Sequence, residues 1–490
     1  MRWISGARAG LALALAAFLF GAGAVEAAQS TAEAGSTASP APKALAVEQA
    51  VADGLAADPG LLSATLDARA AKFREADARF RMLPSLAVSA GYTQLSVEPL
   101  PSLTGIPLPM SLENDIFSFI QKNNIDVNSL LQLFAAPTTE KDIRADLQYP
   151  IFAGFRLHEA AEIAKFQALG KDAAAELNRN ALAFEIRRAY WETVRAQSNV
   201  EAMRKALELE SLMKKEIADL SAQGMANEAD SLEAEARYDQ AELALDQTLS
   251  GKDIAFLMLS SLIGDRSASQ GDGKTEYELT SEPGSIPPAD ALKAAEDSGD
   301  TALVERALAN RPETRVASIA LSAQTAARLA AKGDLYPTLS LTGSLAYADP
   351  DPRIFPAEDI FNLSWSLGLR LRYDLGGVPG ALERSAAADT DLEKARADLA
   401  RQRNAIALDA RKCALALKQA RNSLELTKGM VAQAEEGARV AEQKYEVGMA
   451  KHSEVFQSQL ALVRAQLAVK GKLIDVEIAQ ADLSRALGLK

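Results

Sequence analysis

Residues 221–226 read SAQGMA and residues 445–450 read YEVGMA, and this shared Gly-Met-Ala is the first sign of how the chain is organised. The two glycines are 224 positions apart, and the same offset aligns residues 147–264 with residues 371–488 without a gap. Self-similarity at a fixed spacing indicates an internal duplication. The 490 residues are therefore expected to fold as two copies of one elongated unit, not as unrelated globular domains.

A second offset, of 253 positions, relates the parts upstream, where Pro59 matches Pro312 and Pro84 matches Pro337. Because the two offsets differ by 29, the first copy carries 29 extra residues within the interval 93–142. This interval is rich in proline and poor in alanine. It is therefore expected to be an insertion in a loop.

Long helices are the main element that the sequence predicts. Residues 156–222 contain no proline and one glycine, and strong helix formers such as alanine, leucine and glutamate dominate them. Gly224 and Gly448 each follow such a stretch, and a glycine in this place typically ends a helix. The sequence therefore predicts two helical hairpins, 156–264 and 380–488, with their tips at these glycines.

An acidic residue follows each tip glycine by six positions, Asp230 in the first hairpin and Glu454 in the second. Both fall near the start of the returning helix, where a negative charge interacts favourably with the helix dipole. They are either ordinary capping residues or part of a functional site at the tip. The sequence leaves both possibilities open.

Four short strands, two in each copy, are predicted where apolar and polar residues alternate. Their expected bounds are about 84–93, 143–151, 337–347 and 362–373. One face of the second pair carries large apolar residues that are candidates for facing lipid: Leu339, Leu341, Leu345, Leu363, Trp365, Leu367 and Leu369. Each strand has the length that a tilted transmembrane strand needs. A half-buried sheet in a soluble domain is the alternative.

The N-terminus has the order of a secretory signal, with Arg2 and Arg8 before an apolar run and small residues after it. Residues 1–27 are expected to be removed by cleavage after Ala27, and residues 28–43 to form a flexible lead-in. No cysteine lies near this point, so no lipid-anchored N-terminus is expected.

The composition argues against several kinds of site. A net charge of -13 disfavours binding to a nucleic-acid backbone. The single cysteine, Cys413, has no disulfide partner, and two histidines are too few for a Cys/His zinc cluster. No catalytic motif or phosphate-binding loop is recognisable, so no enzyme activity, metal or cofactor is expected.

Several motifs occur in a characteristic order: Asp58-Pro59 before an Ala/Arg/Glu-rich helix, LPSL at 83–86, YPIFAG at 149–154, and the two Gly-Met-Ala turns. In this order and spacing the chain resembles the TolC-like outer membrane efflux proteins over residues 44–489. The resemblance implies a mainly helical fold with a small β part. Three copies would share a 12-stranded barrel, four strands from each, and a helical barrel would continue it through the periplasm.

The resemblance also implies a function and partners. The homotrimer would sit in outer membrane lipid as an exit duct, fed by an inner-membrane pump (RND, ABC or similar) through a periplasmic membrane-fusion adaptor. The residues that would contact the adaptor are those of the two tips: Gly224, Met225, Ala226, Gly448, Met449 and Ala450. The cargo does not follow from the sequence.

The same resemblance suggests a periplasmic gate at the tips, made of Asp230, Lys451, Glu454 and Gln457. Two positions depart from the pattern of TolC. Gln457 stands where a second acidic ring is expected, and Ala450 stands where an arginine latch is expected, so Lys451 is the nearest cation. The bonding of the gate therefore does not carry over.

The expected organisation is a first repeat at 44–264, a linker at 265–300 level with the middle of the helices, and a second repeat at 301–490. The main alternative function is a periplasmic coiled-coil scaffold or adaptor without a pore of its own. Such adaptors normally carry one helical hairpin, whereas this sequence predicts two, each with a pair of strands.

Overall fold

The computed structural model describes residues 43–94, 118–119, 121–122, 139–265, 277–284, 299–354 and 360–489. The expected signal and nearly all of the lead-in lie outside these residues, as do most of the insertion and of the linker. Residues 44–490 form one compact unit.

Helices make up most of this unit, and they recur in the same order in both copies. The helices of the first copy are α2 (Val47–Ala57), α3 (Pro59–Phe80), α6 (Arg156–Ala222) and α7 (Glu228–Leu262). Those of the second copy are α9 (Gly299–Asn310), α10 (Pro312–Gly333), α11 (Val378–Glu446) and α12 (His452–Ala486). The prediction of a mainly helical fold with a small β part is confirmed.

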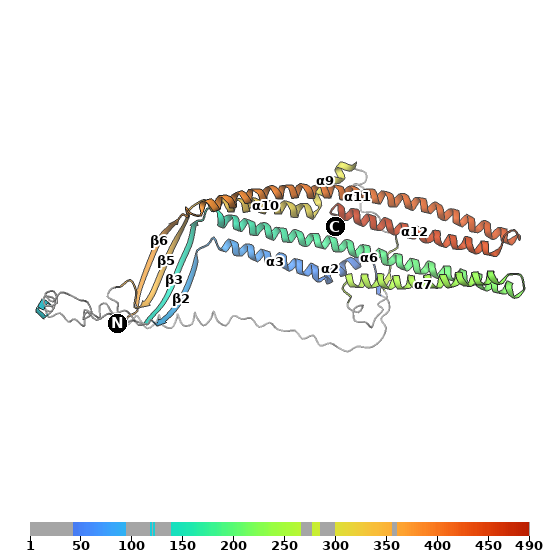
Figure 1. The fold of residues 1–490 in the computed structure, drawn as a ribbon, viewed down its shortest axis with the longest axis horizontal. Helices are drawn as coiled ribbons and strands as arrows, with labels where there is room; N and C mark the ends of the chain where they lie inside the picture. Colours follow the sequence, from blue (N-terminus) through green and yellow to red (C-terminus); the bar gives the residue numbers. More distant parts are fainter. Residues whose placement is uncertain are drawn as a thin grey trace. The chain divides into compact units, whose positions relative to one another are not determined.

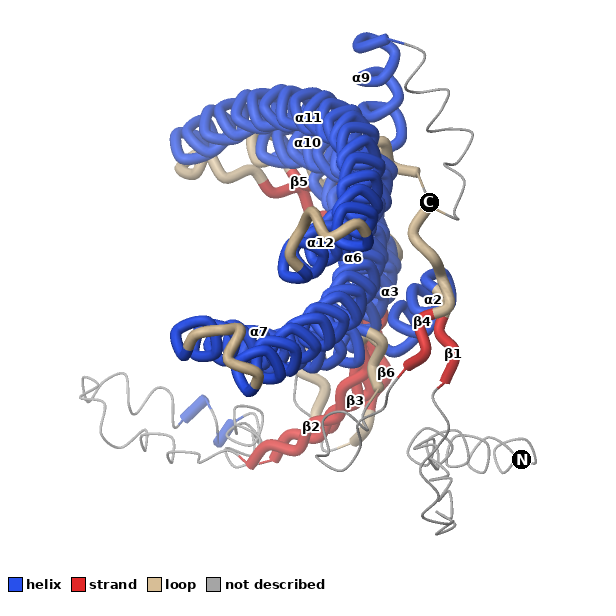
Figure 2. Tube along the Cα trace, turned by 90° about the vertical axis from the view of Figure 1, so that its right-hand side faces the viewer, coloured by secondary structure: helices blue, strands red, loops and turns tan. Residues whose placement is uncertain are grey.

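The long helices lie side by side in one curved layer (Figures 1 and 2). Near the strands the order across the layer is α3, α6, α10, α11, and towards the hairpin ends it is α7, α6, α12, α11. Figure 2 shows α2, α9 and a small sheet of β1 (Lys43–Leu45) and β4 (Tyr277–Leu279) on the convex side. The layer therefore has two edges, one formed by α3 and α7 and the other by α11.

The second sheet has four strands in the order β2, β3, β5, β6, and all neighbours are antiparallel. The strands are β2 (Ser85–Gln94), β3 (Thr139–Phe152), β5 (Thr338–Asp349) and β6 (Asn362–Arg372). β3 is longer than the sequence suggested, since it begins four residues before 143. The central pairing of β3 with β5 joins the two copies of the repeat, while β2 and β6 are the edges.

The register brings the apolar residues of all four strands onto one face. Leu371 lies opposite Leu339 and Leu369 opposite Leu341 across β5 and β6. Tyr149 of β3 continues the second of these rows. The other face carries serine, threonine and charged residues, as a period of two requires.

Two apolar clusters form where the short helices meet the long ones. In the first copy, Ile186 and Tyr190 of α6 are fully buried against α2. The hydroxyl of Tyr190 donates to the carbonyl of Leu45 at 3.0 Å. In the second copy, Leu303 and Ala307 of α9 pack on α11 and α12. These joints fix the short helices to the middle of the layer.

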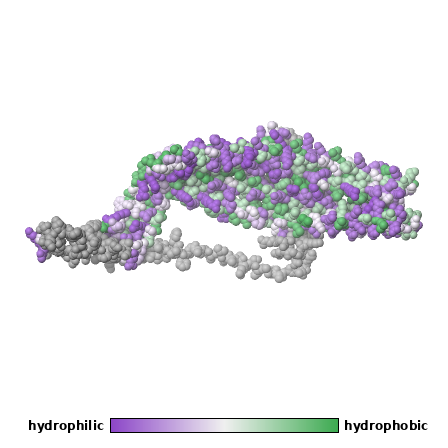
Figure 3. Space-filling view, viewed as in Figure 1, coloured by the Kyte–Doolittle hydropathy of each residue, from purple (hydrophilic) through white to green (hydrophobic). Residues whose placement is uncertain are grey.

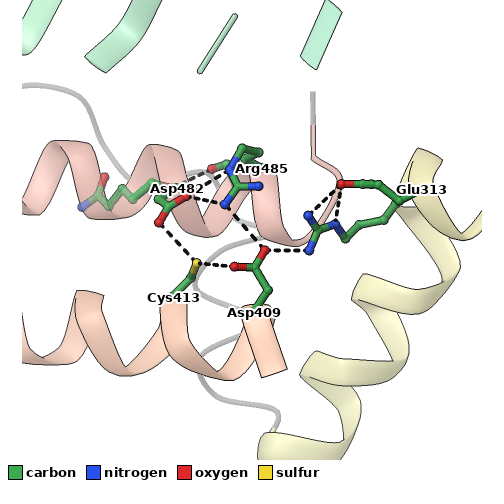
Figure 4. Close-up of polar contacts among 8 residues, drawn as sticks. Glu313, Asp409, Cys413, Asp482 and Arg485 are labelled. Atoms are coloured by element: carbon green, nitrogen blue, oxygen red, sulfur yellow. Dashed lines mark hydrogen bonds and ion pairs between the residues drawn. The ribbon is translucent and has the colours of Figure 1, made fainter. Parts of the chain in front are cut away.

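A partly buried ion network adds to the joint of the second copy (Figure 4). Arg311, only 6% exposed, lies 2.7 Å from a carboxylate oxygen of Asp409. Arg485 lies 3.5 Å from Asp409 and 2.8 Å from Asp482. Burial, followed by the Asp482 carboxylate, raises the pKa of the Cys413 thiol to about 12. The thiol therefore stays protonated and is not a reactive site.

On the face seen in Figure 3, hydrophilic and hydrophobic residues alternate along the helices in small patches. In the described part of the chain, no helix is both long enough and apolar enough to cross a membrane.

Candidate functional site

The hairpin tips are built in the same way in both copies. After α6, the amide of Gly224 donates to Ser221 and that of Met225 to Leu220, at 3.0 and 2.9 Å. The amides of Gly448 and of the methionine after it repeat this pattern after α11. This is a Schellman turn, which needs a left-handed residue, and the two glycines have φ of 72° and 73°.

The tips are open surfaces. A Cβ added at Gly224 or Gly448 would meet nothing within 4 Å. Met225 and Met449 are exposed, the latter by 80%. Each tip therefore presents a large, flexible apolar side chain to its surroundings.

The two acidic residues after the tips differ in their contacts. Asp230 forms a capping box with Asn227. The backbone amide of Asp230 donates to the side-chain oxygen of Asn227 at 2.8 Å, and the carboxylate of Asp230 accepts from the backbone amide of Asn227 at 3.3 Å. The capping interpretation therefore holds for Asp230. Glu454 lies in the first turn of α12, is exposed, and makes no capping bond.

A cavity of about 550 Å³ lies between the two tips. Three of the four predicted gate residues line it, namely Asp230, Lys451 and Gln457, together with the tip residues Met225 and Ala226. Glu454 does not line it. The structure thus brings three of the four predicted gate residues together, whereas Glu454 and the second tip, Gly448-Met449-Ala450, do not line this cavity.

A contact that the sequence did not reveal ties the two hairpins together. His452, the first residue of α12, contacts the carboxylate of Glu216 in α6 through Nδ1. Its ring stacks on Tyr445 with centroids 4.5 Å apart, and lies at the same distance from Phe456. The two aromatic rings fix the orientation of the imidazole. We call these four residues the tip clamp.

Sequence alone could hardly have revealed the clamp. His452 and Glu216 belong to different repeats, and they meet only because α6 packs on α12. The one available signal was that two aromatic residues, Tyr445 and Phe456, flank His452 at positions -7 and +4 near the turn of a helical hairpin.

The predicted strand residues lie on the apolar face, and nothing in the described chain packs on it. Trp365 is 74% exposed, and Leu363, Leu367 and Leu369 are exposed by similar fractions. The two edge strands also keep their outer backbone groups unpaired within the described chain. The described chain therefore leaves a large apolar face uncovered and two strand edges open.

The helical layer has the same property. Large apolar residues are exposed on its edge helices, on the side turned away from the inner neighbour: Leu62, Leu66, Phe73 and Phe80 of α3; Leu232, Leu243, Ile254 and Met258 of α7; Leu408, Leu415, Leu426 and Met430 of α11. Successive residues of a helix are rotated by about 100°, and at this rotation the exposed apolar residues of each helix fall within one stripe. The buried residues of the same helix lie on the opposite side. Each edge of the helical layer therefore carries an uncovered apolar stripe.

The chain was compared with models of known protein families. The model described as outer membrane efflux protein matches residues 50–265 and 303–489. A search of curated protein sequences gives no match.

Solved structures with a similar fold include a membrane protein and two outer membrane proteins. A membrane protein from Pseudomonas aeruginosa is 21% identical with a TM-score of 0.69, over 90% of this chain and 93% of that one. The outer membrane protein VceC from Vibrio cholerae is 16% identical with a TM-score of 0.69, over 90% and 96%. The CmeC outer membrane channel from Campylobacter jejuni is 14% identical with a TM-score of 0.71, over 90% and 85%.

Proposed function

The chain belongs to the outer membrane efflux protein family, and from this premise we propose that three copies assemble into a channel through the outer membrane. The sheets of the three copies would form a 12-stranded barrel with its apolar face towards lipid. The curved helical layers would continue it as a tunnel through the periplasm. This channel is the exit duct for substrates that an inner-membrane pump delivers through a periplasmic adaptor.

One observation carries the proposal: the sheet and the helical layer both end in edges that are apolar or unpaired. Lipid excludes open strand edges, because unsatisfied backbone groups are costly there. Four strands are too few to close on themselves, so the edges have to be covered by further copies of the chain.

The duplication indicates how the copies would pack. The equivalent of α3 in the second repeat is α10, and the equivalent of α11 in the first repeat is α6. Since α10 packs on α6 within one copy, α3 is expected to pack in the same way on α11 of the next copy. By the same argument, α7 is expected to pack on α11 of the next copy, as α12 packs on α6 within one copy.

The exposed stripe of α3 supports this packing. Leu66 occupies the repeat position of Ile319, whose Cγ2 lies 3.6 Å from the Cβ position of Gly170 in α6. Leu62 occupies the position of Arg315, which forms an ion pair with α6 at 2.8 Å. The residues that are exposed on α3 thus correspond to residues that contact α6 in the second repeat.

The strands obey the same relation. β5 corresponds to β2 and β3 to β6, so the pairing of β3 with β5 predicts that β6 pairs with β2 of the next copy. Tyr149 lies opposite Leu341 within one copy, which places Tyr373 opposite Val88 of the next copy. Both side chains of this new pair belong to the apolar face.

Disulfide cross-linking tests the assembly. In a Cys413→Ser background, Leu66→Cys combined with Lys394→Cys reproduces the geometry of Ile319 and Gly170 between copies. We expect this variant to form a covalent trimer under oxidising conditions. The matched control combines Leu66→Cys with Met430→Cys, which lies about 50 Å further along α11. Absence of cross-linking in the first pair, or equal cross-linking in both, contradicts the proposed packing.

At the periplasmic end, the tips Gly224-Met225-Ala226 and Gly448-Met449-Ala450 would bind the adaptor. The exposed Glu454 of each copy would contribute to a ring of negative charge that favours cations. In planar bilayers, Glu454→Gln is expected to lower the selectivity of the channel for cations. Unchanged selectivity would remove Glu454 from this role.

A further inference from the structure

Two arginines stand on the polar face of β6, at the end that leads into α11. Arg370 lies opposite Ser340 and Arg372 opposite Thr338 of β5. The residues between and beside them, Leu369 and Leu371, point to the apolar face, because side chains alternate along a strand.

Both arginines are exposed, and neither forms an ion pair within the described part of the chain. Of the acidic residues on this face, Asp142 and Asp374 have partners of their own, and Asp146 lies level with Ser366 of β6, four residues along the sheet from Arg370. Asp142 is paired with Arg144 at 2.8 Å, towards the far end of the sheet. Asp374 accepts the backbone amide of Gly377 at 3.2 Å.

The neighbouring copy places no acidic residue directly beside Arg372. The register deduced from the duplication places Arg372 beside Ser89 of the next copy and Arg370 beside Gly91. Asp142 leans over Gly91, because a Cβ built there would lie 2.5 Å from its carboxylate oxygen. Asp142 of the next copy can therefore reach Arg370. The residues directly beside Arg372, Thr338 on one side and Ser89 of the next copy on the other, are polar and uncharged, and Arg144 and Asp146 of the next copy lie one strand further on.

We propose that Arg372, reinforced by Arg370, forms a ring of positive charge around the lumen where the strands join the helices, and that this ring attracts anionic solutes. The inference rests on the proposed trimeric channel. Guanidinium groups stay charged at every physiological pH. The low dielectric constant of the surrounding lipid concentrates their electric field in the lumen. A solute would then pass a ring of negative charge at the tips and a ring of positive charge at the base of the barrel.

The test is the zero-current potential of the full-length protein in planar bilayers under a KCl gradient. Arg372→Gln is expected to shift this potential towards that of potassium, and Arg370→Gln to shift it less. Arg372→Lys retains the charge and is expected to leave the potential unchanged.

The outcomes separate the two claims. A conducting wild-type protein whose selectivity is unaffected by Arg372→Gln overturns the ring and leaves the channel standing. An equal shift in Arg372→Lys assigns the effect to shape, and likewise overturns the ring. A wild-type protein that inserts but does not conduct overturns the channel and the ring together.

Discussion

At the scale of single residues, the duplication is visible in how helices end. Gly448 and Gly488 both adopt the left-handed conformation, with φ of 73° and 66°, and both close a Schellman turn. Their surroundings differ. Gly448 has open space around it, whereas a Cβ at Gly488 would lie 2.8 Å from the backbone of Asn310.

The two glycines should therefore respond differently to alanine. Gly448→Ala is expected to cost about 1–2 kcal/mol, the penalty of a left-handed non-glycine residue. Gly488→Ala should cost clearly more, because the end of α9 must also move. The heat-induced loss of the far-ultraviolet circular dichroism signal measures both, and equal midpoints would contradict the account.

Glu477 offers a test by pH. Its side chain in α12 is only 6% exposed and accepts the backbone amide of Gly284 at 3.1 Å. Burial raises the pKa of this carboxyl above its ordinary value, although the hydrogen bond opposes the shift. A carboxyl with a raised folded-state pKa stabilises the fold below its unfolded-state pKa, and loses that contribution as the pH rises through the folded-state pKa.

Glu477→Gln keeps the hydrogen-bond acceptor and removes the charge. The variant should therefore unfold at a higher temperature than the wild type at pH 7.5, and the difference should shrink towards pH 4. A difference that is constant with pH would mean that ionisation of Glu477 does not affect stability.

At the scale of elements, the tip clamp distinguishes two seams that are otherwise related by the repeat. Within one copy, α12 is tied to α6 by His452 and Glu216. The seam expected between copies has Glu228 and Val440 at the equivalent positions, which cannot form such a pair. The two hairpins of one copy should therefore hold together more firmly than hairpins of neighbouring copies.

His452→Ala tests this directly. Without the contact to Glu216 and the stacked ring, amides of residues 446–456 should exchange hydrogen several-fold faster, while the strands and the middle of the layer stay unchanged. Glu228→Ala, at the equivalent exposed position of α7, is the control and should have little effect. Equal effects of the two substitutions would show that His452 is not a clamp.

At the scale of the whole molecule, the sequence predicted what depends on local patterns. The tips followed from Gly224 and Gly448, because a glycine after a long helix has few other uses. The apolar face followed from the alternation around Trp365. The tip clamp and the network at Arg311 could not be predicted, because they join residues from different helices whose packing no local pattern encodes.

The open edges of the helical layer also become visible only in the whole molecule. The spacing of Leu408, Leu415 and Leu426 on α11 is helical, but only the structure shows that this stripe points away from every described neighbour. The stripe then becomes informative through the duplication, since it occupies the positions at which α6 packs on α10 and α12.

The most direct test of the central claim is the mass of the particle extracted from the outer membrane fraction in mild detergent, measured by native mass spectrometry. The account predicts a particle of three chains, which dissociates only on unfolding. A single chain recovered as soluble periplasmic material would contradict the channel and favour a periplasmic scaffold instead.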